Sequence, residues 1–226
     1  MKSSKAANES DRSPSALKLT GVGLLLVGAG WFLIQAFKSD IPKPNVKPFA
    51  SLGSLAADET AALIGRSGSI AIVSEIPDPK SPGSDAMVRS IKMVAAEVDG
   101  FKATLQHKGN FTYPPELKLV RPSNAMKTLW PAGEFLKLLQ KHPSTTTIVA
   151  FCYLPGQLSP TERSLLQTRT GKLIIVGGVV PEVKPLVDQG VAHLAVSSMV
   201  PVPQPADPAP ETPQAWVRRV YVVLKP

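Results

Sequence analysis

Short runs of β-branched and apolar residues alternate with helix-like segments between residues 136 and 198, and this alternation constrains the fold more than any other feature of the sequence. The apolar runs have the length and composition of buried strands. They are TTTIVAFCY at 145–153, KLIIVGG at 172–178 and VAHLAVS at 191–197. The helix expected after the first run opens with Ser159-Pro160-Thr161-Glu162, a capping box with proline at the first helical position. The pattern predicts a parallel sheet with crossover helices.

The flanking segments extend the same pattern. They are a strand at 69–76 (SIAIVSEI), a helix capped by Ser84 or Asp85 that ends at Gly100, a strand at 101–106 (FKATLQ), a short strand at 116–120 (ELKLV), a helix at 134–142, a helix at 181–189 and a terminal strand at or near the sheet edge at 216–224 (WVRRVYVVL). Six prolines indicate a Pro-rich surface loop at 201–213. We therefore expect a three-layer α/β domain at 66–226. Its mostly parallel sheet of five to six strands would have the flavodoxin-like order 2-1-3-4-5.

An uncharged stretch of 19 residues at 19–37 is long enough to cross a bilayer as a helix. We expect it to be a single transmembrane helix that follows a disordered basic tail at 1–18. The small residues at 28–30 also fit a signal-peptide cleavage site, but the apolar run continues to Ile34, which favours an uncleaved anchor. Basic residues lean slightly toward the N-terminal side of the span, so we expect the domain on the extracytoplasmic side of the cell membrane.

Residues 38–65 are expected to connect the span to the domain. Three prolines in 41–50 (IPKPNVKPFA) predict a semi-rigid extended stalk. Asp58 then has the position of an N-cap for a short helix that ends at Gly65. The predicted organisation is therefore a tail, a transmembrane helix, a stalk with a short helix, and the α/β domain.

The charge and the residues that usually carry chemistry argue against several function classes. The net charge is +8, but the basic residues outside the tail are scattered, which argues against nucleic-acid binding. The one cysteine, Cys152, lies in an apolar run and is expected to be a buried core residue. The three histidines have no ligand-type spacing, and His193 is expected in a core or edge role. No nucleophile elbow or Walker motif occurs. We expect no catalytic residue, metal or cofactor.

Several polar residues would gather at the carboxyl edge of the predicted sheet, where ligands bind in open α/β folds. The ligand-binding candidates are Glu75, Asn110, Tyr153, Gly177, Gly178 and Ser197, with Lys108 and Ser198 beside them. Glu75 is the one acidic residue of this set. Gly177 and Gly178 end a strand before a helix, where backbone N–H groups can hold an anion. A tight structural turn is the favoured interpretation of the pair.

Three passages have the spacing of a known protein family. They are SIAIVSEI with the following helix MVRSIKMVAAEV, then LLQKHPSTTTIVAF, then GKLIIVGGVVPEVKPLVDQGVAHLAVSSMVP. With these passages, residues 68–199 resemble the second lobe of periplasmic sugar-binding proteins of the ribose/galactose type, which share their fold with the LacI-type repressor core. In that family two lobes enclose the sugar, and acidic residues after the third and fourth strands accept hydrogen bonds from its hydroxyls. This chain has room for one lobe, and Leu154 and Val179 stand where those acids would be.

The resemblance implies the fold and a binding role, and the apolar residues argue against sugar binding of the family's usual kind. We expect a membrane-anchored, non-catalytic binding module for a partner protein of the cell envelope or a small polar ligand. A structural or assembly component of an envelope complex is the alternative. An enzyme with a site at the strand ends, built around Glu75, is the weaker one.

Overall fold

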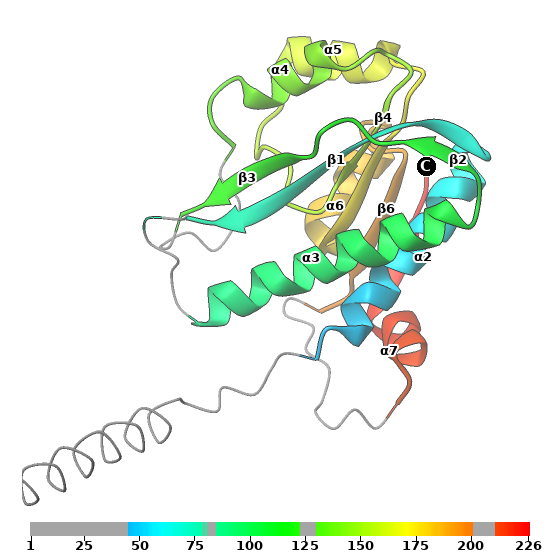
Figure 1. Ribbon diagram of the computed structural model, residues 1–226. Helices are drawn as coiled ribbons and strands as arrows, with labels where there is room; N and C mark the ends of the chain where they lie inside the picture. Colours follow the sequence, from blue (N-terminus) through cyan, green and yellow to red (C-terminus); the bar gives the residue numbers. More distant parts are fainter. Residues whose placement is uncertain (1–44, 79, 81–84, 123–129, 201–210) are drawn as a thin grey trace, which may run out of the picture. The chain divides into compact units, whose positions relative to one another are not determined.

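The computed structural model describes residues 45–78, 80, 85–122, 130–200 and 211–226 (Figure 1). Its helices are α2 (Lys47–Ile64), α3 (Asp85–Gln106), α4 (Glu134–Lys141), α5 (Pro160–Thr168), α6 (Val180–Asp188) and α7 (Pro213–Val220). Its strands are β1 (Ser67–Pro77), β2 (Asn110–Thr112), β3 (Leu117–Arg121), β4 (Thr147–Ala150), β5 (Leu173–Val179), β6 (Leu194–Ser198) and β7 (Tyr221–Leu224). The α/β prediction is confirmed, with seven strands in the sheet rather than five to six.

The predicted tail at 1–18 and transmembrane helix at 19–37 lie outside the described residues, as do the start of the stalk and most of the Pro-rich loop. Within the part of the chain that the structure describes, no helix is long and apolar enough to span a bilayer. Membrane attachment therefore stays a prediction from the sequence.

The strands follow the order β2-β1-β4-β5-β6-β7, and β3 also pairs with β1. Residues 67–69 of β1 pair with β2, and residues 73–77 of β1 pair with β3. These pairings and those of β1 with β4, β4 with β5 and β5 with β6 are parallel, whereas β7 runs antiparallel to β6. The strands β3-β1-β4-β5-β6 thus have the predicted order 2-1-3-4-5. Strand 2 of this order is β3, which corresponds to the short strand expected at 116–120.

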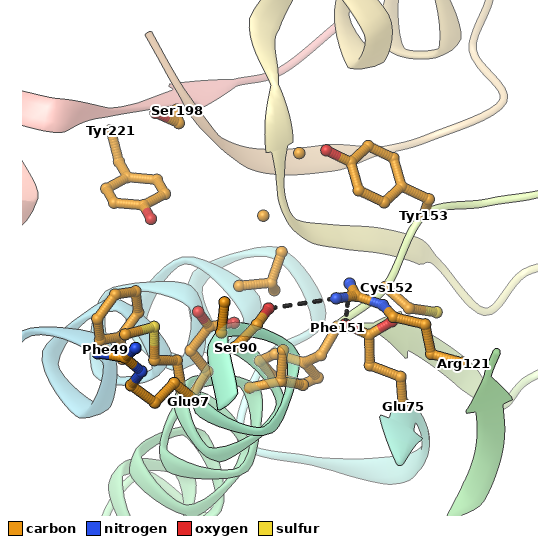
Figure 2. Close-up of a pocket in the computed structure, with 17 residues that line it drawn as sticks. Phe49, Glu75, Ser90, Glu97, Arg121, Phe151, Cys152, Tyr153, Ser198 and Tyr221 are labelled. Atoms are coloured by element: carbon orange, nitrogen blue, oxygen red, sulfur yellow. Dashed lines mark hydrogen bonds and ion pairs between the residues drawn. The ribbon is translucent and has the colours of Figure 1, made fainter. Parts of the chain in front are cut away.

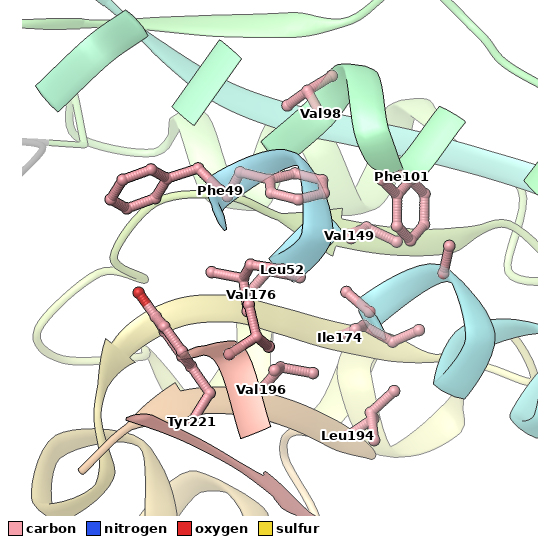
Figure 3. Close-up of a cluster of buried hydrophobic side chains, with 14 of the residues drawn as sticks. Phe49, Leu52, Val98, Phe101, Val149, Ile174, Val176, Leu194, Val196 and Tyr221 are labelled. Atoms are coloured by element: carbon pink, nitrogen blue, oxygen red, sulfur yellow. The ribbon is translucent and has the colours of Figure 1, made fainter. Parts of the chain in front are cut away.

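Successive strand residues point to opposite faces of the sheet, and each face packs on its own helices. On one face, Val149 and Val196 form a buried cluster with residues of α2, α3 and α7 (Figure 3). On the other face, Val73 and Ile148 form a cluster with residues of α4 and α5, and a smaller cluster lies under α6. The three predicted layers are therefore present.

Residues 101–106 continue helix α3, so the strand predicted there is wrong. Phe101 and Leu105 are fully buried and extend the apolar face of the preceding turns by helical steps. Gly100 does not end the helix. A Cβ atom there would lie 2.1 Å from the carbonyl oxygen of Ala50, so the glycine instead allows α2 and α3 to pack closely.

Helix α2 occupies the end of the predicted stalk as well as the predicted short helix. It runs over Lys47–Ile64, with Gly65 as its C-cap. Leu52 and Ala56 on its inner face are fully buried in the core. The prolines of 41–50 suggest an extended segment, but Pro48 stands in the first turn of a helix, where proline has no hydrogen bond to lose. For residues 47–50 the stalk prediction is therefore wrong, and α2 belongs to the domain.

The terminal segment is a helix followed by a strand, which corrects the single strand predicted at 216–224. Thr212 caps α7, because its hydroxyl accepts a hydrogen bond from the backbone N–H of Ala215 at 3.2 Å. Trp216, Val217 and Val220 are buried, which is the spacing of one helix face. The predicted edge position holds for β7, which ends the strand order.

Candidate functional site at the carboxyl ends of the strands

A cavity of about 530 Å³ lies between α3 and the carboxyl ends of β1, β4, β5 and β6 (Figure 2). This is the edge at which the sequence predicts a site, and the volume lies in the usual range of small-molecule sites. Phe49 of α2 and Tyr221 of β7 also line it. Its polar lining residues include Glu75, Ser90, Glu97, Arg121, Tyr153 and Ser198.

Glu75 and Arg121 form a buried ion pair on one wall of the cavity. The parallel pairing of β1 with β3 places the two residues near one another. Arg121 donates from Nε to Oε2 of Glu75 at 3.0 Å and from Nη2 to Oε1 of the same carboxylate. Its Nη1 donates to the hydroxyl of Ser90 on α3 at 3.3 Å. The side chains of Glu75 and Arg121 are 2% and 11% exposed. Their two hydrogen bonds therefore neutralise a carboxylate that burial would otherwise destabilise.

Glu97 is a second buried acid of the cavity wall. It lies on α3 and is 7% exposed, and no residue of the described ranges forms a hydrogen bond or ion pair with its carboxyl group. Burial raises its pKa to about 8, and the negative charge of Glu75 contributes to the rise. As long as no cation lies beside it, Glu97 therefore holds its proton at neutral pH.

Aromatic rings form another part of the wall. Phe49 and Tyr221 both contact Trp216 of α7, with ring centroids 5.5 Å and 5.6 Å apart. These contacts hold the two cavity-lining rings in place. Burial raises the pKa of Tyr221, with the Glu97 carboxyl as a further cause, so the phenol stays neutral. Figure 2 shows Tyr221 and Ser198 on the side of the cavity opposite Phe49 and Glu97.

Four of the six predicted site residues line this cavity, namely Glu75, Tyr153, Gly177 and Gly178. Ser198, which the sequence places beside them, lines it as well. Gly177 and Gly178 have φ angles of 97° and 70°, which favour glycine. Both glycines lie within β5, where the pairing with β6 shifts register between Val176 and Val179, so they form an irregularity of the strand rather than the predicted tight turn.

The other predicted residues lie elsewhere. Asn110 begins β2, which pairs with the amino-terminal end of β1. Lys108 forms an ion pair with Asp58 of α2 at 2.9 Å. Ser197 is fully buried, and its hydroxyl donates to the carbonyl oxygen of Gly177 at 3.1 Å. The prediction for Asn110 and Lys108 assumes a strand at 101–106, and because this segment is helical they do not reach the carboxyl edge.

Sequence reasoning does not single out Arg121, Ser90, Glu97 or Tyr221, all of which line the cavity. Two signals are visible in retrospect. Arg121 directly follows the short apolar run at 116–120, so it ends a strand. Glu97 is an acid beside the apolar face of a helix, where an exposed position is expected for a charged residue.

The remaining sequence features have structural roles. Leu154 packs against the core, Val179 is the N-cap residue of α6, and neither lines the cavity. Cys152 is buried, and burial raises its pKa. Nδ1 of His193 accepts a hydrogen bond from the backbone N–H of Leu173 at 3.3 Å. In the described residues no group of three or more acidic, histidine or cysteine side chains is placed to hold a metal ion.

No protein-family model and no curated protein matches the chain. Several solved structures are similar to part of it. The XylFII molecule has 15% sequence identity and a TM-score of 0.45, over 78% of this chain and 60% of that one. An ABC transporter solute-binding protein from Agrobacterium vitis, bound with α-D-tagatopyranose, has 17% identity and a TM-score of 0.44, over 66% of this chain and 44% of that one.

An ABC sugar transporter subunit from Rhodobacter sphaeroides has 16% identity and a TM-score of 0.45, over 80% of this chain and 62% of that one. The chain thus spans less than two thirds of each of these proteins. The Agrobacterium vitis protein is bound with a sugar and the Rhodobacter sphaeroides protein is a sugar transporter subunit, and the similarity covers part of each of them.

Proposed function

We propose that the chain is a membrane-anchored, non-catalytic binding module that takes a small polar ligand in the cavity at the carboxyl ends of its strands. The observation that supports this best is the convergence of buried polar groups on one cavity of about 530 Å³. Ligand sites typically combine apolar walls with a few fixed polar groups. Here the polar groups are the Glu75–Arg121 pair, the Glu97 carboxyl, and the hydroxyls of Ser90 and Ser198.

The proposed ligand is not tied to a sugar. The positions at which the resembling family holds sugar hydroxyls carry Leu154 and Val179, which lie outside the cavity lining. The polar groups come instead from β1, β3, β6 and α3. A ligand held by them would be recognised through charge and hydrogen bonds of a different set of residues.

The membrane anchor and the extracytoplasmic placing of the domain are proposed from the sequence of residues 19–37. Alkaline carbonate extraction of membranes tests the anchor. The chain should stay in the membrane pellet, and its release into the supernatant would count against an uncleaved transmembrane helix.

A thermal-shift screen of the full chain in non-ionic detergent tests the ligand. Sugars, polyols, amino acids and amines would be added at millimolar concentration. A compound present at 100 times its Kd stabilises the fold by about 2.7 kcal/mol, which is a readily measured shift.

Two variants on neighbouring positions of α3 locate the site. Met93 lines the cavity and Lys92 is exposed, so Met93→Trp should abolish the shift by filling the cavity while Lys92→Trp should leave it intact. If no compound shifts the wild-type chain, small-molecule binding is refuted. Co-purification of a stoichiometric envelope protein would then favour the assembly component.

A further inference from the structure

The cavity is lined by one buried carboxyl group, that of Glu97, with which no basic group of the described residues forms an ion pair. The acidic and basic side chains that face it are Glu75, Glu97, Arg89, Arg121, Cys152, Tyr153 and Tyr221. Arg121 is occupied by Glu75, to which it donates two hydrogen bonds. Arg89 donates from Nε to the carbonyl oxygen of Asp85 and stands more than two helical turns before Glu97. Glu97 is therefore a buried carboxyl that faces the cavity without a counter-charge.

The surfaces near Glu97 suit a positive charge. Phe49 and Tyr221 present aromatic rings to the same cavity, and Trp216 holds both rings through direct contacts. Aromatic rings attract cations, and they do so most strongly in sites shielded from water. In Figure 2 Phe49 and Tyr221 lie on either side of the space that Glu97 borders.

The charge balance distinguishes between classes of ligand. An anion would oppose the ionisation of Glu97 and keep it protonated, and the charge of Arg121 is already neutralised by Glu75. A neutral polyol would meet a protonated Glu97 and supply no counter-charge that could ionise it. An organic cation would supply that charge and place its carbon atoms against the rings of Phe49 and Tyr221.

We propose that the cavity binds a small organic cation, an amine or quaternary ammonium compound, whose positive charge lies between the carboxylate of Glu97 and the rings of Phe49 and Tyr221. This inference rests on the proposed function, that the cavity takes a small polar ligand. It specifies the chemical class of that ligand and the residue that selects it.

Isothermal titration of the full chain in non-ionic detergent with matched pairs of compounds tests the class. One pair is choline and 3,3-dimethylbutan-1-ol, the uncharged alcohol in which carbon replaces the choline nitrogen. The other pair is ethanolamine and ethylene glycol. The charged member of at least one pair should bind about tenfold more tightly than its uncharged partner, because it alone supplies the missing counter-charge.

Proton release is a second readout, obtained by repeating the titration at pH 7 in phosphate and in MOPS, two buffers that differ in their enthalpy of protonation and carry no net positive charge. Since the pKa of Glu97 is about 8, the group is mostly protonated at this pH, and a bound cation should expel about 0.9 proton per ligand. An uncharged ligand should expel none.

Three variants separate Glu97 from the rest of the cavity. Glu97→Gln keeps the shape but cannot become negative, so it should abolish proton release and weaken cation binding about tenfold or more. Phe49→Leu keeps the apolar volume and should weaken choline binding several-fold by removing a ring. Glu134→Gln makes the same chemical change in the first turn of α4, outside the cavity lining, and it should bind as the wild type does.

The outcomes distinguish the two proposals. Equal affinity for charged and uncharged members, or undiminished cation binding by Glu97→Gln, overturns the cation class. If uncharged compounds from the thermal-shift screen bind in a way that Met93→Trp abolishes while choline and ethanolamine do not bind, the cation class is refuted and the small-ligand function stands. If no compound binds at all, both proposals fail.

Discussion

Replacing Glu97 by glutamine should change how the stability of the fold depends on pH. In the unfolded chain this carboxyl has its ordinary pKa of 4.5, whereas burial raises its pKa in the folded chain to about 8. Below the unfolded pKa both states are protonated and the group makes no difference. As the pH rises from 4.5 to 8, the unfolded state releases the proton and the folded state keeps it, so the free energy of unfolding falls. Above pH 8 both states are ionised and the decrease stops.

The size of this effect follows from the two pKa values. Each pH unit between them lowers the free energy of unfolding by at most about 1.36 kcal/mol. Between pH 5 and pH 7 the loss should be about 2–3 kcal/mol, slightly below the maximum for two pH units because the unfolded carboxyl is not yet fully ionised at pH 5. Glu97→Gln has no such proton to release. Its buried amide adds a destabilisation of about 1–3 kcal/mol, but this term does not vary with pH.

Urea denaturation of the full chain in non-ionic detergent at pH 5, 6 and 7 measures the difference, with the fluorescence of buried Trp216 as a probe. The wild type should lose stability relative to Glu97→Gln as the pH rises, and Glu134→Gln should follow the wild type. If the wild type and Glu97→Gln change in parallel over this range, Glu97 is not held protonated by burial and the reasoning is refuted.

Three further variants test the packing around the site. Gly100→Ala should lower the free energy of unfolding by about 1–3 kcal/mol in urea denaturation, because its Cβ would lie 2.1 Å from the carbonyl oxygen of Ala50. This loss should outweigh the better helix propensity of alanine, and unchanged stability would mean that α2 and α3 pack less closely. Arg121→Met should cost about 3–5 kcal/mol because it removes the guanidinium that neutralises the buried Glu75 carboxylate, and adding Glu75→Gln should restore much of the loss. A single variant as stable as the wild type would argue against the pair. Ser159→Ala removes the capping box of α5 and should lower the free energy of unfolding by about 1 kcal/mol. Ligand affinity should not change, and a change in affinity would contradict the location of the site.

Much of the sheet could be predicted because its strands are buried on both faces. The apolar runs that became β1, β4, β5 and β6 are continuous, and parallel strands covered by helices have that composition. The capping box at Ser159 forms as predicted, with Glu162 accepting from the backbone N–H of Ser159 at 2.7 Å. These signals lie within a few residues of each other, so they do not depend on the rest of the chain.

The candidate site could be predicted only in part. Glu75, Tyr153, Gly177 and Gly178 lie at the predicted edge because the direction of a parallel strand fixes where its end lies. Glu97 was not predictable in this way, because it comes from the middle of a helix that crosses above the strand ends. Its burial depends on how α3 packs against α2 and on which residues close the far side of the cavity.

The sequence alone determined the layered α/β architecture and the edge of the sheet at which a cavity forms, since both follow from periodicity and strand direction. Tertiary structure decided that residues 101–106 and 216–220 are helical rather than extended. Their apolar residues fit a short strand locally, but they pack on one helix face against α2 and the sheet. It also decided that Glu97 stands without a counter-charge, because pairing is a matter of distance between segments far apart in the chain. Arg121 lies close enough to Glu75 to neutralise it, and no described basic group does the same for Glu97.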